Sequence, residues 1–450
     1  MPVRPRAVES PRTRAARVLP ALLVASLAFL MAVAPAAAVE GAPAAESPSP
    51  PALTGGLPAS FAITGRGYGH GVGLSQYGAR GRALAGQTAE HILAHYFQGT
   101  TMGTVSTATM VRVLVLSSYR ADAATPLRIY GRGSTWRIDG VDQTFPADAA
   151  LRIWREVEGT TGVWKLRVTS ATGTQLELRR FSSTLIVRPA TSTSTLELYS
   201  KPGTNDRYRG VLKVLIGSTA SVVNSLSLEP YLRGVVPMEM PSSWPVEALR
   251  AQAISARSYA VRRLHPTTGA YDVYDDTRSQ MYGGVNAERA ATNAVLSSTA
   301  GKVLKSGSVV ASTFFHSTGG AATESNENAW VSAKGDRVAS PVSYLRGSAD
   351  VDAAGRPYDA AAPYATWKTG VMSPYRLQTI VNSDPRTSVG TLASVTVISR
   401  GVSGRVVKIR LVGSAGTKDV SGQVFRQVLN TKLSTASPVR STLFYITPAG

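Results

Sequence analysis

The glutamate at position 239 has the surroundings of a general acid. It follows Val235, Val236 and Met238 and precedes Met240 and Trp244. If these apolar side chains close around the carboxyl group, the loss of hydration raises its pKa and keeps it protonated near neutral pH. That is the state a general acid requires. The same position also fits a structural role, because a carboxylate near the start of a helix interacts favourably with the helix dipole. Glu247 fits that second role better.

A helix is expected directly after this glutamate, and it has two different sides. Pro245 suits a first helical turn. An apolar stripe then recurs every three or four residues, at Val246, Leu249, Ala253, Ala256, Ala260 and Leu264. Gln252, Ser255 and Tyr259 fall on the opposite side. They line either a polar groove or an ordinary solvated face, and the spacing alone does not choose between the two.

The histidines and serines give weaker patterns. His91 and His95 are four residues apart, as metal ligands on one helix face often are, but Ile92 and Leu93 between them indicate packing. The sequence has no cysteine, so a metal would depend on histidine and carboxylate ligands. His316 and Asp275 leave a Ser-His-Asp triad open, although no G-x-S-x-G element frames a serine. The glycine-dense loop at residues 65–73 resembles neither a Walker loop nor a dinucleotide-binding fingerprint, because no strand–turn–helix unit with a later ribose-binding acid follows it.

Four blocks of the sequence together resemble the stage II sporulation protein D family, which also includes amidase enhancers. They are residues 69–79, 226–263, 276–284 and 314–320. The resemblance implies a lytic transglycosylase that cleaves glycan strands already stripped of stem peptides and leaves 1,6-anhydro-muramic ends. It also implies that the glutamate of the Glu-Met-Pro motif, here Glu239, is the catalytic residue.

The same resemblance implies a substrate-binding groove built from the four blocks. Its expected residues are His70, Ser75, Gln76, Gln252, Arg257, Tyr259, Ser279, Gln280, Tyr282, His316 and Ser317. Some relatives bind zinc through cysteine and histidine, and that site does not carry over to a chain without cysteine. We therefore expect neither a metal nor another cofactor.

The sequence predicts an α+β fold, with β-rich mixed sheets, a few packed helices and a catalytic groove beside the alanine-rich helix. Short strands separated by turn residues are expected at residues 111–116, 127–130, 151–154, 164–169, 175–178, 184–188 and 211–216. Helices are expected from an N-cap at Thr88 and at residues 226–236, 288–297 and 421–429. Further strands are expected at residues 303–304, 309–316 and 443–446, and a hairpin at 392–411.

We divide the chain into five segments. Residues 1–38 have a basic start, an apolar run and small residues at 35–38, the pattern of a secretory signal peptide. Residues 39–58 form a Pro/Ala/Ser-rich linker. Residues 59–104 carry the Gly-His-Gly-Val-Gly block, residues 105–223 are β-rich, and residues 224–448 form the core that resembles the sporulation family.

The order of the blocks differs from that of the sporulation enzymes. There the Gly-His-Gly-Val-Gly block follows the last strands, whereas here it comes first. We therefore expect a circularly permuted arrangement, in which residues 61–100 pack against residues 392–446 with the site assembled between them.

Charge and composition indicate an exported protein with an anionic partner. The net charge is +20, and the segment before residue 39 contributes five arginines and one glutamate, which leaves about +16. Peptidoglycan glycan strands are the expected partner, and anionic wall polymers or a wall amidase are further candidates. No basic helix or aromatic–basic interleaving indicates nucleic acid. We expect a secreted, wall-located enzyme without a stable membrane anchor after cleavage.

Two other functions remain open at this stage. One is a non-catalytic wall-binding module or amidase activator, which would share the same motifs. The other is a purely structural surface protein, which the polar segments argue against.

Overall fold

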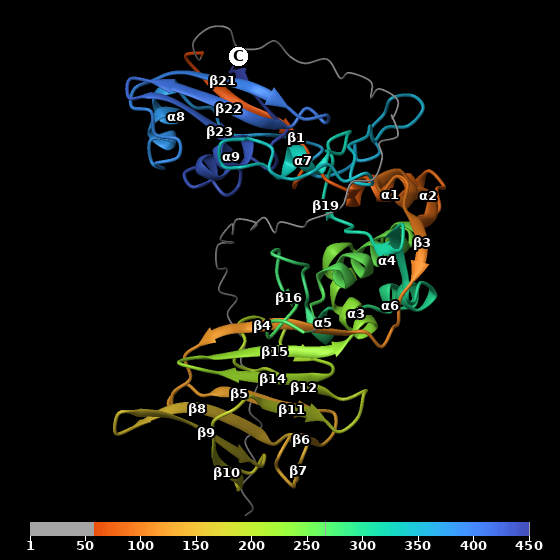
Figure 1. The fold of residues 1–450 in the computed structure, drawn as a ribbon, viewed down its shortest axis with the longest axis vertical. Coiled ribbons are helices and arrows are strands. Elements are labelled where there is room, and N and C mark those ends of the chain that lie inside the picture. The colour runs from red at the N-terminus through yellow and green to blue at the C-terminus, as the bar shows by residue number, and fades with distance from the viewer. Residues whose placement is uncertain (1–57, 266, 450) are drawn as a thin grey trace, which may run out of the picture.

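The computed structural model describes residues 58–265 and 267–449. The predicted signal peptide and all but the last residue of the predicted linker lie outside these residues. Within them, Figure 1 shows a β-rich unit at the bottom, a helical unit in the middle and a second sheet-containing unit at the top. The fold is α+β, as the sequence predicts.

The β-rich unit consists of two sheets. The seven-stranded sheet has the order β16-β4-β15-β14-β11-β6-β7 and the six-stranded sheet the order β10-β9-β8-β5-β12-β13. Apolar residues alternate with polar ones along strands such as β5, and the buried faces of both sheets join one hydrophobic cluster. The strand bounds are β4 (Met110–Tyr119), β5 (Leu127–Arg132), β6 (Trp136–Ile138), β7 (Thr144–Phe145), β8 (Ala150–Glu158), β9 (Thr161–Thr169), β10 (Gln175–Phe181), β11 (Leu185–Pro189), β12 (Thr195–Glu197), β13 (Arg207–Tyr208), β14 (Val211–Ile216), β15 (Ala220–Ser227) and β16 (Val273–Tyr274).

All seven strands predicted in this region are present, but β15, like the short strands β6, β7, β12 and β13, was not predicted. Its polar residues interrupt the alternation that marks a strand. One of them, Asn224, is fully buried and donates from Nδ2 to the carbonyl oxygens of Arg209 and Val211. Leu226 and Ser227 pair with β4, so the helix predicted from residue 226 begins only at Leu228.

The helical unit surrounds one central helix, α4 (Val246–Arg263). Around it pack α1, α2, α3, α6 and β17. The bounds of the helical unit's elements are β2 (Leu74–Ser75), α1 (Gln76–Leu84), α2 (Ala89–Tyr96), β3 (Thr101–Thr104), α3 (Leu228–Glu239), α5 (Gly284–Ala287), α6 (Ala290–Ser298), β17 (Lys302–Ser306), β18 (Val309–Val310) and β19 (Phe315–His316). Thr88 caps α2, as predicted.

The structure removes one alternative that the sequence left open for α4. Its polar side is not a solvated face, because Gln252 and Ser255 are as fully buried as the alanine stripe. One sequence prediction in this unit is wrong. The continuous strand expected at residues 309–316 is broken between β18 and β19. There the chain instead uses side-chain partners: the Ser312 amide donates to the Tyr344 hydroxyl, and the Thr313 hydroxyl donates to the Ser255 carbonyl.

The third unit contains the predicted hairpin and last helix. Its sheets have the orders β21-β22-β23 and β20-β1-β24. The bounds are β1 (Phe61–Arg66), α7 (Asn326–Ala329), β20 (Thr366–Lys368), α8 (Pro374–Val381), β21 (Leu392–Arg400), β22 (Val406–Gly413), β23 (Gly416–Ser421), α9 (Gly422–Asn430) and β24 (Phe444–Pro448).

Both ends of the described chain meet in this third unit. Strand β1 pairs antiparallel with β24, with Phe61 opposite Pro448 and Gly65 opposite Phe444. Figure 1 shows β1, in orange, among the blue C-terminal strands. The expected packing of the first segment against the last strands is therefore confirmed for β1. The loop after β1 also contacts the third unit, since the Gly69 amide donates to the Arg440 carbonyl at 3.4 Å. Helices α1 and α2 behave differently, because they pack on α4.

Candidate functional site

Glu239 is the last residue of α3 and is partly exposed. The backbone N–H of Met281 donates to its Oε1 at 2.9 Å, and the Gln76 side chain donates from Nε2 to its Oε2 at 3.4 Å. Among the described residues, no lysine, arginine or histidine forms an ion pair with this carboxylate. Glu239 is therefore a carboxyl group with two neutral donors and no counter-ion.

This environment raises the pKa of Glu239 above its ordinary value of 4.5. Burial is the largest cause, because the surrounding protein disfavours the charged form. The hydrogen bonds from Met281 and Gln76 act in the opposite direction, since they stabilise the carboxylate. Burial outweighs them, so the protonated form persists to higher pH than in an exposed glutamate. The charge of Glu239 also contributes to the raised pKa of Tyr259, after burial.

The loop that donates the Met281 N–H is held by three predicted site residues. Gln280 accepts from the Tyr231 hydroxyl at 3.1 Å and donates to the Ala256 carbonyl at 3.2 Å. The Tyr282 hydroxyl donates to Asn224 Oδ1 at 2.8 Å, and Ser279 Oγ accepts from the Tyr274 amide. Gln280 and Tyr282 are buried, so their geometry suits positioning of the loop and not contact with a ligand.

Gln76 is positioned by the start of α1. The buried Ser75 hydroxyl oxygen caps this helix by accepting from the Gly78 amide, and it also accepts from the Gly319 amide, both at 3.1 Å. This leaves Ser75 occupied by backbone contacts beneath the surface. It links α1 to the Gly-Gly loop at residues 319–320.

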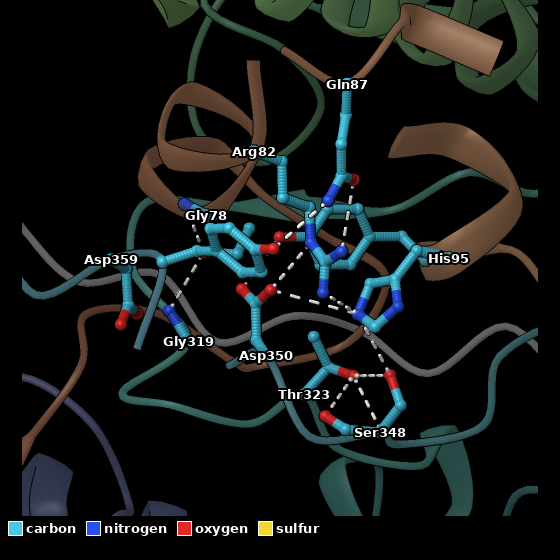
Figure 2. A network of polar contacts seen from close by, with 12 residues as sticks. Gly78, Arg82, Gln87, His95, Gly319, Thr323, Ser348, Asp350 and Asp359 are labelled. Atoms are coloured by element: carbon cyan, nitrogen blue, oxygen red, sulfur yellow. Dashed lines mark hydrogen bonds and ion pairs between the residues drawn. The ribbon is translucent and has the colours of Figure 1, made fainter. Parts of the chain in front are cut away.

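A buried polar network fixes the rest of α1 (Figure 2). The carboxylate of Asp350 accepts from Arg82 Nε at 2.9 Å and from the Tyr96 hydroxyl at 2.7 Å. Arg82 Nη2 lies 2.8 Å from His95 Nε2, which must accept because arginine only donates. Burial, followed by the Arg82 charge, lowers the pKa of His95 to about 4. His95 is thus neutral near pH 7, and its 3.8 Å approach to Asp350 is not an ion pair at that pH.

His70 and His316 lie together, with ring centroids 5.4 Å apart. The Val72 amide donates to His70 Nδ1 at 3.0 Å, and His316 Nδ1 lies 3.3 Å from the Val72 carbonyl. Burial is the main reason that the pKa of His316 falls well below 6.5, and the nearby His70 and the Arg405 guanidinium lower it further. His70 retains solvent exposure, whereas His316 is buried and the Ser317 hydroxyl contacts Thr318.

The structure separates the predicted residues of α4. Arg257 is fully buried and forms two hydrogen bonds of 2.8 Å with Glu229, so it joins α4 to α3 and is not placed to meet a substrate. Both amide atoms of the buried Gln252 have no partner among the described residues. Tyr259 packs against Phe314 and Phe315 beneath the Arg263 guanidinium.

The contacts of Glu239 correct one expectation about the site. They come from α1 and the loop before α5, and none of its hydrogen-bond partners lies in residues 392–446. The Met281 amide was not among the predicted residues, because a backbone donor has no signature in sequence. A cavity of about 580 Å³ lies on β1, β20 and β24 and is lined by none of the predicted site residues, so the groove beside α4 remains a prediction.

The comparisons with known proteins fit this site. The family model described as "SpoIID: Stage II sporulation protein" matches residues 217–305, which include Glu239 and Met281. The chain carries a SpoIID domain.

Three relatives show how far the similarity extends. The amidase enhancer of Bacillus subtilis is 42% identical over 97 residues, 21% of this chain and 13% of its own length. The stage II sporulation protein D of the same organism is 29% identical over 210 residues, 42% of this chain and 57% of its own. An uncharacterized protein of Brachyspira hyodysenteriae is 32% identical over 123 residues, 27% of this chain and 33% of its own. The matches thus span between 13% and 57% of the relatives' lengths.

Two further searches of the described residues concern membranes and metals. Within residues 58–265 and 267–449, no helix has both the length and the apolar character needed to cross a bilayer. In the same residues, no three histidine or acidic side chains gather in a way that could hold a metal ion.

Proposed function

We propose that this protein is an exported peptidoglycan-remodelling enzyme, a lytic transglycosylase that cleaves the bond between N-acetylmuramic acid and N-acetylglucosamine. The observation that carries the proposal is the state of Glu239. It is a partly exposed carboxyl group with a raised pKa and with no counter-ion among the described residues, in the SpoIID domain. A group in that state can donate a proton near neutral pH.

One carboxyl group suffices for this reaction. The Glu239 carboxyl donates its proton to the glycosidic oxygen as the bond from that oxygen to the muramic acid C1 breaks. The resulting carboxylate then takes the proton of the C6 hydroxyl of the same sugar while that oxygen bonds to C1. Ordinary glycosidases need a second carboxylate to manage water or a covalent intermediate. Here the attacking hydroxyl belongs to the substrate and is held close at high effective concentration.

The two hydrogen-bond donors to Glu239 suit a group that acts first as an acid and then as a base. The Met281 amide and the Gln76 side chain stabilise the carboxylate that exists between the two proton transfers. Burial favours the protonated form that the first transfer requires. Among the predicted substrate-binding residues, His70 has the position that best suits contact with the glycan, because it is exposed. Tyr259 is buried within electrostatic reach of Glu239, so it suits tuning of the carboxyl group and not contact with the glycan.

A second function is favoured by one relative. The chain is 42% identical to the amidase enhancer over 97 residues. A protein that activates a wall amidase, or only binds the wall, would use the same domain without cleaving glycan.

The experiment incubates the purified chain with amidase-stripped peptidoglycan and identifies the products by mass spectrometry. The proposal predicts 1,6-anhydro ends. New reducing ends would show a hydrolase and contradict it. If there are no products, but a wall amidase works faster when the chain is added, the enhancer function replaces the transglycosylase.

A further inference from the structure

Three arginines form a row across neighbouring strands of the six-stranded sheet. Arg128 of β5 lies directly opposite Arg152 of β8, which lies directly opposite Arg167 of β9. Their strand neighbours Leu127, Ile153 and Leu166 are buried on the inner face, so the row lies on the outer face. Adjacent strands are ~4.8 Å apart, so the backbone positions of the three arginines lie within about 10 Å of one another.

The row is not neutralised within the described residues. None of the three arginines has a carboxylate within 4.0 Å, and the one side-chain hydrogen bond among them runs from Arg152 Nη1 to Thr169 Oγ1 at 3.0 Å. The basic residues beside the row differ in this respect. Arg132 pairs with Glu197 at 2.5 Å, and Lys165 pairs with Glu156 at 2.5 Å. The sheet therefore neutralises the flanking charges and leaves the central three unpaired.

Aromatic rings support two of these guanidinium groups. Arg167 lies over the Trp154 ring at 5.7 Å, and Arg128 lies over the Tyr199 ring at 6.0 Å. Such contacts limit the motion of the guanidinium groups while leaving their N–H donors open to a ligand.

Like charges directly opposite one another destabilise a sheet. A row of three on one face is therefore a cost to folding, and binding of an anion is the simplest compensation. We propose that Arg128, Arg152 and Arg167 form a binding site for a phosphodiester-linked anionic wall polymer. Guanidinium groups bind phosphate oxygens through paired N–H donors. A phosphodiester polymer carries a charge at every link, which matches closely spaced cations better than a stripped glycan, whose carboxylates sit on alternate sugars.

This site is separate from Glu239. The inference rests on the wall location in the proposed function, but not on catalysis. It assigns a role to the β-rich unit, which would hold the protein on the polymer while the SpoIID domain acts on glycan. The sequence showed no aromatic–basic interleaving, because the row joins three strands that are separate in sequence.

The test measures binding of fluorescently labelled poly(glycerol phosphate) to the full chain at physiological salt. The variant R128Q/R152Q/R167Q is compared with R356Q/R386Q/R410Q, which removes the same charge from exposed arginines that pair with aspartates. We expect binding to weaken at least about tenfold in the row variant, because each lost bond is to a charged group. The control should stay within about twofold, because exposed charges far from the ligand are screened.

Further readouts distinguish a specific site from an effect of net charge or of folding. The row variant should unfold at the same or a higher temperature than the wild type, because repulsion is relieved. The Glu239→Gln variant should bind the polymer normally, whether or not the chain cleaves glycan. If the control variant loses as much polymer binding as the row variant, net charge alone explains the effect, and the proposed site is contradicted. Unchanged binding in the row variant, tighter binding of polygalacturonate or duplex DNA, or a clear loss of stability in the row variant would overturn the proposal.

Discussion

At the residue scale, the chemistry depends on a balance around one carboxyl group. Burial raises the pKa of Glu239, while the Met281 amide and the Gln76 side chain lower it. The sequence predicted the burial, because apolar residues flank Glu239 on both sides. It could not predict the Met281 donor, since that amide reaches Glu239 only through the fold of the loop at residues 279–282.

The pH profile of glycan cleavage should report this balance. As pH rises through the pKa of Glu239, the acid loses its proton and the rate should fall, with a midpoint above pH 4.5. This fall in rate is the alkaline limb of the pH profile. Gln76→Leu removes a donor that favours the carboxylate, so the alkaline limb should move to higher pH. The exposed Gln423→Leu should leave the limb in place. A limb that moves to lower pH in Gln76→Leu would show that Gln76 does not act on Glu239 in this way.

At the element scale, α4 shows why a local pattern predicts a helix better than it predicts the surroundings of that helix. The 3–4 residue spacing located α4, but α4 is enclosed on all sides, and this followed from tertiary packing that no local pattern contains. Arg257 illustrates the error, because its predicted substrate role gives way to a buried pair with Glu229. Helix α1 was not predicted, and its Arg82 is held by Asp350, more than 250 residues away in sequence.

A glycine in α1 tests how tightly this helix is held. A Cβ atom at Gly78 would lie 2.1 Å from Asp350 Oδ2 and 2.2 Å from the Tyr96 hydroxyl. Gly78→Ala should therefore disturb the network of Figure 2, destabilise the protein by about 1–3 kcal/mol and weaken cleavage by displacing Gln76. Urea unfolding and the glycan assay measure both effects.

Gly370→Ala is the matched control, because a Cβ atom there meets nothing within 4 Å. It should leave stability and cleavage nearly unchanged. Equal stability of the two variants would show that α1 has more freedom than its contacts indicate.

At the scale of the whole molecule, the third unit is built from both ends of the described chain. Phe61 and Ile63 of β1 belong to the same hydrophobic cluster as Phe425 and Phe444. The early position of the Gly-His-Gly-Val-Gly block predicted this closure. The sequence did not predict that α1 and α2 leave this unit and complete the helical one.

Loss of the β1 anchor should destabilise the third unit. Phe61 is completely buried, so Phe61→Ala should cost about 3–5 kcal/mol and speed proteolysis within residues 367–446. Tyr375→Ala is the control, because this aromatic side chain is 75% exposed and should contribute little. Similar proteolysis of the two variants would contradict the closure of the unit by β1.

The most direct measurement compares Glu239→Gln with Glu247→Gln on amidase-stripped peptidoglycan. Glu247 is the matched glutamate, because it accepts from the Ala89 amide and pairs with Arg250, contacts that serve structure. We expect Glu239→Gln to reduce the release of 1,6-anhydro products at least about 100-fold, because its amide cannot donate the required proton. Glu247→Gln should retain most activity. Undiminished release of products by Glu239→Gln would contradict the assignment of Glu239 as the acid.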